Sequence, residues 1–346
     1  MALGARGRAV LVAKFENAVI EFFVLLGGKM LSDGQLNDAM EKLRAQQSAI
    51  PENEIENLFQ KAIECEYWRT LCPEMGIMIK RHLDHLEGAP LSSEQATWAC
   101  AHLERHGYFH IPGIISRTAV APMYKSVETV RSLGWPSVFA FVYDEFWSIW
   151  RTPSLVNFLS RKLGTGYLQT APICTYRVDP QTRGSGKPPH VDSRNNEERV
   201  SVWIPLADAT IDNGCMYVIP RDRVPPGLPA SYLDWTVVSR DELGILLRNV
   251  IPLPATAGSV LGWNNGLIHW GGRALEPTAF PRISIAAEFM SERATPRSGE
   301  TPVFDLKLPD FATRLRVIGN SILQYENLPV MRKYCGLATK LVEWKS

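Results

Sequence analysis

Residues 188–205 read P-P-H-V-D-S-R-N-N-E-E-R-V-S-V-W-I-P, and this stretch decides how the rest of the chain is interpreted. Its end, V-S-V-W-I-P, is typical of a β-strand, and on a strand His190 and Asp192 would leave the same face because they are two positions apart. A third metal ligand can come from His269, in G-S-V-L-G-W-N-N-G-L-I-H-W-G-G-R, the only other histidine after position 110. Two histidines and one carboxylate leave three coordination positions open, which suits non-haem Fe(II) and its chemistry with O2.

The composition is that of an ordinary globular protein. The 346 residues are 45% hydrophobic and 21% charged, and the formal net charge of +1 gives no support to a nucleic-acid partner. The 6 cysteines are scattered without a C-x-x-C pair, which indicates reduced thiols. No apolar run reaches the roughly 18 residues of a membrane helix, and no cleavage pattern of a targeting segment is present. We therefore expect a cytoplasmic protein without a membrane or nucleic-acid partner.

The order of predicted elements divides the chain into three parts. Residues 1–90 have helical periodicity and no catalytic pattern, and we expect them to form a helical extension that packs outside the core and contributes to a pocket wall or a homodimer interface. Residues 91–310 form the second part. A capping box at Ser92 and Gln95 opens its helical lead-in, 91–165, and core strands follow over 168–290. A helical tail over 311–346 is the third part.

The middle of the chain predicts a mainly β core within an α+β fold. Short β-rich runs are separated by Pro, Gly, Asp and Asn, at 168–178, 199–206, 214–219, 248–252, 258–263 and 282–290. Such a series favours a β-sandwich or barrel over a βαβ sheet. No phosphate-binding glycine motif and no G-x-S-x-G occurs, so nucleotide binding and serine hydrolysis have no motif support.

A co-substrate site is predicted beside the metal. The commonest co-substrate that chelates such an iron is 2-oxoglutarate, whose distal carboxylate needs a counter-charge, and a planar arginine fork is the natural partner. Arg282 opens the strand R-I-S-I-A-A-E-F after His269, and Ser284 lies on the same face, where its hydroxyl can donate a second hydrogen bond.

The order of these motifs resembles the phytanoyl-CoA dioxygenase family of Fe(II)/2-oxoglutarate oxygenases over roughly residues 91–289. The opening L-S-S-E-Q-A-T-W-A-C-A-H-L-E-R-H-G-Y-F-H-I-P-G-I-I-S is similar to the family's helix followed by G-Y and I-P-G. The stretch W-I-P-L-A-D-A-T-I-D-N-G-C-M-Y-V-I-P-R-D is similar to its strand, acidic turn, N-G and next strand. Here Arg221-Asp222-Arg223 stand where the family has G-S-H.

The resemblance implies a double-stranded β-helix, the jelly roll of cupin-like proteins. It implies His190, Asp192 and His269 as iron ligands and Arg282 as the 2-oxoglutarate anchor. Thr175 would be a further co-substrate contact on the strand before H-x-D, with Arg177 as the alternative. Since halogenating relatives have a small residue at the position of Asp192, the carboxylate favours C–H oxidation: hydroxylation, desaturation or ring formation.

Substrate contacts are harder to predict. Trp203 lies near the proposed ligands in sequence, and Trp263 and Trp270 bracket His269, so each would either contact substrate or belong to the core. Arg194 follows Asp192 closely and would either line the mouth of the site or belong to a solvated loop. The aromatic stretch 139–150 would form either a lid or the packing between a helical layer and the sheet. A small natural-product scaffold is preferred over a CoA thioester, because no cluster of basic residues is present.

Three rival functions share parts of this pattern. A Jumonji-type protein hydroxylase would share the metal ligands but usually has a lysine where Arg282 stands. A non-catalytic jelly-roll binding protein would not need the intact ligand set. A zinc hydrolase could use the same ligands, but no general-base carboxylate stands at a recognisable spacing.

Overall fold

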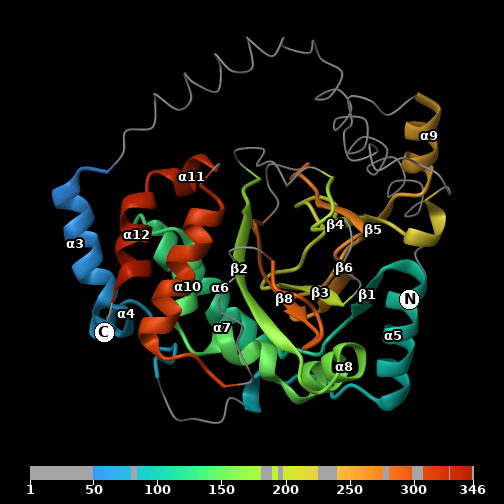
Figure 1. Cartoon of the computed structure of the whole chain (residues 1–346), viewed down its shortest axis with the longest axis horizontal. Coiled ribbons are helices and arrows are strands. Elements are labelled where there is room, and N and C mark those ends of the chain that lie inside the picture. The colour runs from blue at the N-terminus through green and yellow to red at the C-terminus, as the bar shows by residue number, and fades with distance from the viewer. Residues whose placement is uncertain are drawn as a thin grey trace.

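The computed structural model describes residues 50–78, 84–180, 189–193, 198–224, 240–275, 280–297, 307–326 and 328–344. Two antiparallel sheets form the core (Figure 1). The five-stranded sheet has the order β1-β6-β3-β8-β2 and the three-stranded sheet the order β5-β4-β7. The strands are β1 (Tyr108–Ile111), β2 (Leu168–Val178), β3 (Arg199–Pro205), β4 (Met216–Ile219), β5 (Ile251–Leu253), β6 (Val260–Asn264), β7 (Ile268–Gly271) and β8 (Arg282–Met290).

The larger sheet is buried on both faces, and the alternation of side chains assigns each face a different role. Along β8, Ile283 and Ile285 belong to one hydrophobic cluster together with the helices, whereas Ala286 packs against the other cluster, which contains the smaller sheet. On β3, Ile204 and Trp203 divide between the two clusters in the same way. This period of two leaves one face for packing and the other for a site between the sheets.

The helices cover the packing face of the larger sheet. Figure 1 shows α10 beside β2, with α12 and then α3 further out on the same side, away from β4 and β5, while α5 lies beside β1. The helices are α3 (Glu52–Ile63), α4 (Cys65–Leu71), α5 (Ser93–His106), α6 (Arg117–Ser132), α7 (Glu145–Ser148), α8 (Pro153–Leu163), α9 (Arg240–Arg248), α10 (Phe311–Gln324), α11 (Pro329–Arg332) and α12 (Cys335–Glu343). The predicted capping box is present: Ser92 Oγ accepts from the Gln95 backbone N–H, and the Gln95 side chain accepts from Ser92 N–H.

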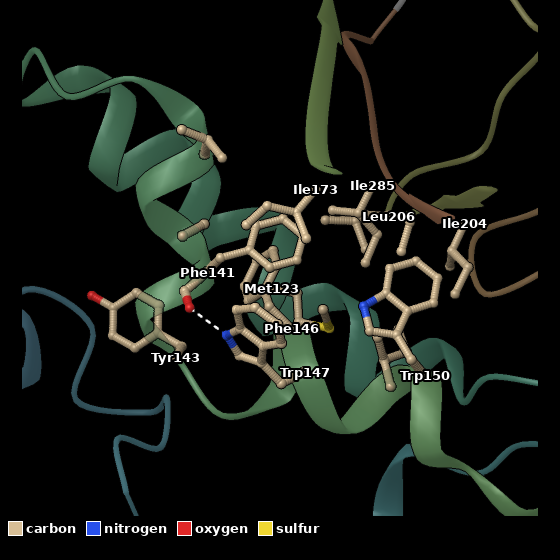
Figure 2. Close-up of a cluster of buried hydrophobic side chains, with 14 of the residues drawn as sticks. Met123, Phe141, Tyr143, Phe146, Trp147, Trp150, Ile173, Ile204, Leu206 and Ile285 are labelled. Carbon is tan, nitrogen blue, oxygen red and sulfur yellow. Dashed lines mark hydrogen bonds between the residues drawn. The ribbon is translucent and has the colours of Figure 1, made fainter. Parts of the chain in front are cut away.

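The aromatic stretch 139–150 packs the helical layer against the sheet, so it is not a lid. Figure 2 shows Phe141, Phe146, Trp147 and Trp150 against aliphatic side chains of the strands. Trp147 and Trp150 are both buried, and the indole N–H of Trp147 donates to the Phe141 carbonyl at 2.6 Å. The strand residues that meet this layer in Figure 2 include Ile173 and Ile285.

The predicted fold class is confirmed as a mixed fold with an antiparallel β core and flanking helices. The strands predicted at 168–178 and 282–290 coincide with β2 and β8. The strand predicted through His190 and Asp192 is wrong: only His190 pairs, in a single bridge to His269. None of the described helices has both the length and the apolar character that a membrane span requires. The domain boundaries at 90 and 310 stay a prediction, and residues 1–49 lie outside the described part.

Candidate functional site

The backbone brings the first two candidate ligands together. The N–H of His190 donates to the carbonyl of His269 at 3.1 Å, and the N–H of His269 donates to the carbonyl of His190 at 3.0 Å. Their ring centroids lie 4.3 Å apart. A single pair of backbone hydrogen bonds therefore joins the loop before β3 to β7 and places two imidazoles side by side.

Asp192 completes a group of three ligand atoms. Its Oδ1 lies 3.6 Å from His190 Nε2 and 3.7 Å from His269 Nε2, and ligand atoms of the three residues lie within 4.8 Å of one another. Among the described residues it is the one such group of His, Cys, Asp or Glu side chains. Two nitrogen ligands and one oxygen ligand from one side of a cavity form the donor set of a non-haem iron site.

The other oxygen of Asp192 is held by the protein. Oδ2 accepts from Ser201 Oγ at 2.7 Å and from Trp263 Nε1 at 2.9 Å. Burial alone would raise the pKa of this carboxyl, but the neighbouring His269 and His190 and the hydrogen bonds from Trp263 and Ser201 hold the pKa well below its usual range. Asp192 is therefore an anion at neutral pH, as a metal ligand must be.

His269 is oriented by its other ring nitrogen. Nδ1 lies 3.0 Å from the carbonyl oxygen of Leu267, which can only accept, so Nδ1 donates to it and Nε2 is the nitrogen that could bind a metal. The Trp263 ring stands 4.3 Å from the imidazole centroid and supports its plane. Nε2 therefore faces Asp192 Oδ1 as a ready ligand atom.

Arg282 lies in the same cavity, next to the strand that carries His269. An added Cβ at Gly271 would lie 3.0 Å from Arg282 Nη2 and 3.2 Å from Nη1, so the guanidinium rests directly on that glycine. Its Cζ stands 5.7 Å from the centroid of the Trp203 ring, and its Nη1 lies 3.6 Å from Met216 Sδ. Because Gly271 is two residues beyond His269 on β7, the guanidinium lies roughly one pleat repeat, about 7 Å along the strand, from a metal ligand.

This end of the cavity has polar atoms that lack partners. Arg282 is 3% exposed and forms no ion pair with any described carboxylate, and burial lowers its pKa to about 10, against smaller raising effects of Cys215 and Tyr176. Its Nε, the Oγ of Ser284 and the Nε1 of Trp203 are all buried without a hydrogen-bond partner in the described structure. Unpaired buried donors of this kind are costly unless a ligand satisfies them.

The remaining wall is built from strands and from the end of α10. The cavity has a volume of about 240 Å³. Besides the ligands and Arg282, its lining includes side chains that sequence reasoning missed: Cys174, Tyr176, Ser201, Glu288, Gln324 and Tyr325. The alternation of side-chain direction along β2 could have identified Cys174 and Tyr176 once it was known which face of the strand points into the cavity.

Three predicted contacts are not brought to the cavity. Thr175 Oγ1 donates to Ser137 Oγ at 2.6 Å, and Arg177 forms ion pairs with described acidic side chains, because odd positions of β2 face the helical layer. Trp270 stacks on Tyr217, with centroids 5.4 Å apart. Two other predicted contacts, Trp203 and Trp263, do line the cavity. Arg194 lies outside the described residues.

Residues 144–277 match the family model for phytanoyl-CoA dioxygenase (PhyH), a segment that contains all three candidate ligands. This segment is therefore similar to phytanoyl-CoA dioxygenase (PhyH). Together with the His-Asp-His group, the match identifies the protein as an oxidoreductase enzyme whose cofactors are iron and 2-oxoglutarate. The donor set of the triad fits the metal, and the unpaired donors around Arg282 fit the carboxylate of the co-substrate.

Solved structures are similar to this protein in fold alone. The non-heme monooxygenase ThoJ, in its apo form, aligns with a TM-score of 0.50 at 15% identity over 68% of this chain and 98% of ThoJ. The epimerase SnoN in complex with Fe3+, alpha ketoglutarate and nogalamycin RO aligns at 0.47 and 16%, over 58% and 85%. The carbocyclase SnoK from nogalamycin biosynthesis aligns at 0.45 and 20%, over 59% and 87%. No curated protein matches the chain.

Proposed function

We propose that the protein is a dioxygenase that oxidises a C–H bond of an uncharged small molecule, in the first instance by hydroxylation. One observation carries the proposal: a His-Asp-His group shares one cavity with a buried arginine that has no carboxylate partner among the described residues. A structural arginine would be paired, and a purely structural triad would need no neighbouring cation. An anion that binds both the metal and Arg282 explains the two features together.

The proposed reaction is balanced by its co-substrate. The substrate R–H, 2-oxoglutarate and O2 become R–OH, succinate and CO2, with one oxygen atom of O2 in the new hydroxyl and the other in succinate. Iron, when bound, supplies the activation of O2 that is coupled to oxidative loss of CO2. The two electrons that O2 needs beyond those of the C–H bond come from 2-oxoglutarate, so no separate reductant is required for a complete turnover.

The protein's own residues bind, orient and exclude water. His190, Asp192 and His269 would hold the iron, and Arg282 with Ser284 would hold the distal carboxylate of 2-oxoglutarate. Because Arg282 is buried, its charge acts in a medium of low polarity and its hydrogen bonds to a carboxylate are strong. Asp192 would fill a coordination position that could otherwise accept halide, and this favours hydroxylation over halogenation.

One wall of the cavity is uncharged, and we assign the substrate to it. β2 contributes Cys174 and Tyr176, and Gln324 and Tyr325 come from the end of α10. Cys174 Sγ donates to Tyr325 Oη at 3.1 Å, which fixes the two against each other. A thiol, two phenols and an amide recognise hydroxyl, carbonyl and aromatic groups. Such groups are typical of natural-product scaffolds, whereas the phosphates of a CoA thioester would require cations here.

The first test is an anaerobic titration of the apoprotein with Fe(II) and 2-oxoglutarate. The expected result is the weak visible charge-transfer band of the chelate in the wild type and its absence in His190→Ala. With O2 admitted, the wild type should then release succinate, and a panel of hydroxylated aromatic compounds should raise that rate where one is a substrate. Absence of the band from both proteins would refute the proposal in favour of a non-catalytic binding protein, and stimulation by peptides alone would favour a protein hydroxylase.

A further inference from the structure

We infer that Ser201, Trp263, Asn265 and Glu288 form a positioning row that holds Asp192 as a one-oxygen metal ligand. The row is a consequence of strand register: Ser201 on β3 pairs with Trp263 on β6 and with Glu288 on β8. The three side chains therefore stand next to one another across the sheet, on the face that lines the cavity. Asn265 follows β6 directly. The inference rests on the proposed function, because it concerns the metal that the triad would bind.

Two members of the row donate hydrogen bonds to Oδ2 of Asp192, the oxygen that does not face the histidines. A carboxylate oxygen has two lone pairs, and Oδ2 accepts one hydrogen bond from Ser201 and one from Trp263. Oδ1 alone faces the two Nε2 atoms. A metal bound between the histidines would therefore meet one free oxygen of Asp192, and the other coordination positions would stay available to 2-oxoglutarate and O2.

Asn265 limits how the Ser201 hydroxyl can turn. Its Nδ2 donates to Glu288 Oε2 at 2.6 Å, which fixes the amide with Oδ1 towards Ser201 Oγ, 3.3 Å away. The hydroxyl has one proton, and the nearer acceptor is Asp192 Oδ2 at 2.7 Å. Turning that proton to Asn265 would leave two acceptor oxygens facing each other at the shorter distance, so the arrangement selects the bond to Asp192.

Glu288 anchors the row in the protein interior. Its Oε1 accepts from Arg199 at 2.7 Å, and its Oε2 accepts from Arg297 at 3.0 Å in addition to Asn265. Arg199 is completely buried. The backbone of Asn265 also restrains the loop that carries Asp192, because the Asn265 carbonyl accepts a hydrogen bond from the N–H of Ser193, the residue after Asp192, at 3.0 Å. The loop that carries Asp192 is thus tied to the sheet by both side chain and main chain.

The test uses two variants that remove one hydrogen bond each from Oδ2, Ser201→Ala and Trp263→Phe. The phenyl ring of the second keeps an aromatic face beside His269 and loses the N–H together with part of the indole ring, a loss of volume that Trp147→Phe matches among the controls. Anaerobic calorimetric titration of each apoprotein with Fe(II) should show binding weakened about 10–100-fold, the usual range for outer partners of metal ligands. The charge-transfer band of the 2-oxoglutarate complex should also shift, because the coordination of Asp192 changes.

Matched controls separate positioning from a general loss of stability. Ser126→Ala and Trp147→Phe each remove one buried hydrogen bond in the helical layer, to the carbonyls of Met123 and Phe141. They should lower the melting temperature comparably while leaving Fe(II) affinity and band position unchanged. The inference would be overturned if both test variants bound Fe(II) with wild-type affinity and showed an unshifted charge-transfer band. If Ser201→Ala does not fold, the result for Trp263→Phe alone decides. A wild type that binds no Fe(II) would instead refute the proposed function.

Discussion

A methyl group at position 271 should disturb the 2-oxoglutarate end of the cavity and leave the metal ligands in place. In Gly271→Ala the new Cβ would lie 3.0 Å from Nη2 of Arg282 and 3.2 Å from Nη1, where ordinary contacts are 3.4–4 Å. The guanidinium must therefore move by a few tenths of an ångström. The Arg282 guanidinium has little room to move away, because Met216 and the Trp203 ring lie against it.

The expected effect can be estimated from the geometry of the arginine fork. A hydrogen bond to a charged group contributes about 1.5–3 kcal/mol. A displacement of a few tenths of an ångström misaligns one of the two bonds that Arg282 would make to the carboxylate and keeps the charge. A loss of about 1.4 kcal/mol corresponds to roughly a tenfold rise in the Kd for 2-oxoglutarate.

The assay is titration of the Fe(II) form with 2-oxoglutarate under argon, followed by the charge-transfer band. Gly266→Ala is the matched control, because the nearest heavy atom to its added Cβ is Ser193 O at 3.9 Å. The control should bind 2-oxoglutarate as the wild type does, and both variants should keep wild-type Fe(II) affinity. Unchanged 2-oxoglutarate affinity in Gly271→Ala would show that Arg282 is not the anchor, and equal losses in both variants would point to the loop instead.

Other contacts give three more predictions. Arg282→Lys should raise the Kd for 2-oxoglutarate by about tenfold to a hundredfold, since an ammonium cannot form the planar fork. In the wild type the Kd for 2-oxoglutarate should rise as the pH passes about 10, where the Arg282 guanidinium loses its proton. Arg314→Met should lower the free energy of unfolding in urea by about 3–5 kcal/mol, because Asp144, its buried partner at 2.6 Å, loses this ion pair, and adding Asp144→Asn should recover part of that loss. Ser92→Ala should cost about 1 kcal/mol in the same assay through loss of the helix cap, without changing Fe(II) affinity.

Sequence reasoning performed best where residue type alone restricts the structure. The edges of β2 and β8 were predictable because turn residues bound both runs. His190, Asp192 and His269 were predictable as a group because His190 and His269 are the only histidines after position 110 and Asp192 lies two residues from the first of them. The inward face of β2 was not, since period-two alternation does not say which parity faces the cavity. The family resemblance implies that Thr175 contacts the co-substrate, whereas the structure places it against Ser137.

The residues that support Asp192 could not be found in the sequence, because pairing between strands decides them. Ser201 and Asn265 are 64 positions apart, and Asn265 and Glu288 are 23 apart, with no motif that links them. A shift of one residue in the β3–β8 register would turn Glu288 towards the helices and bring a packing position such as that of Ala287 into its place. The same register also fixes which face meets the aromatic layer of Figure 2. The hydrophobic packing that selects the register thereby also sets the metal ligand's surroundings, and this coupling explains why a site with a recognisable ligand pattern still depends on contacts that only the folded sheet creates.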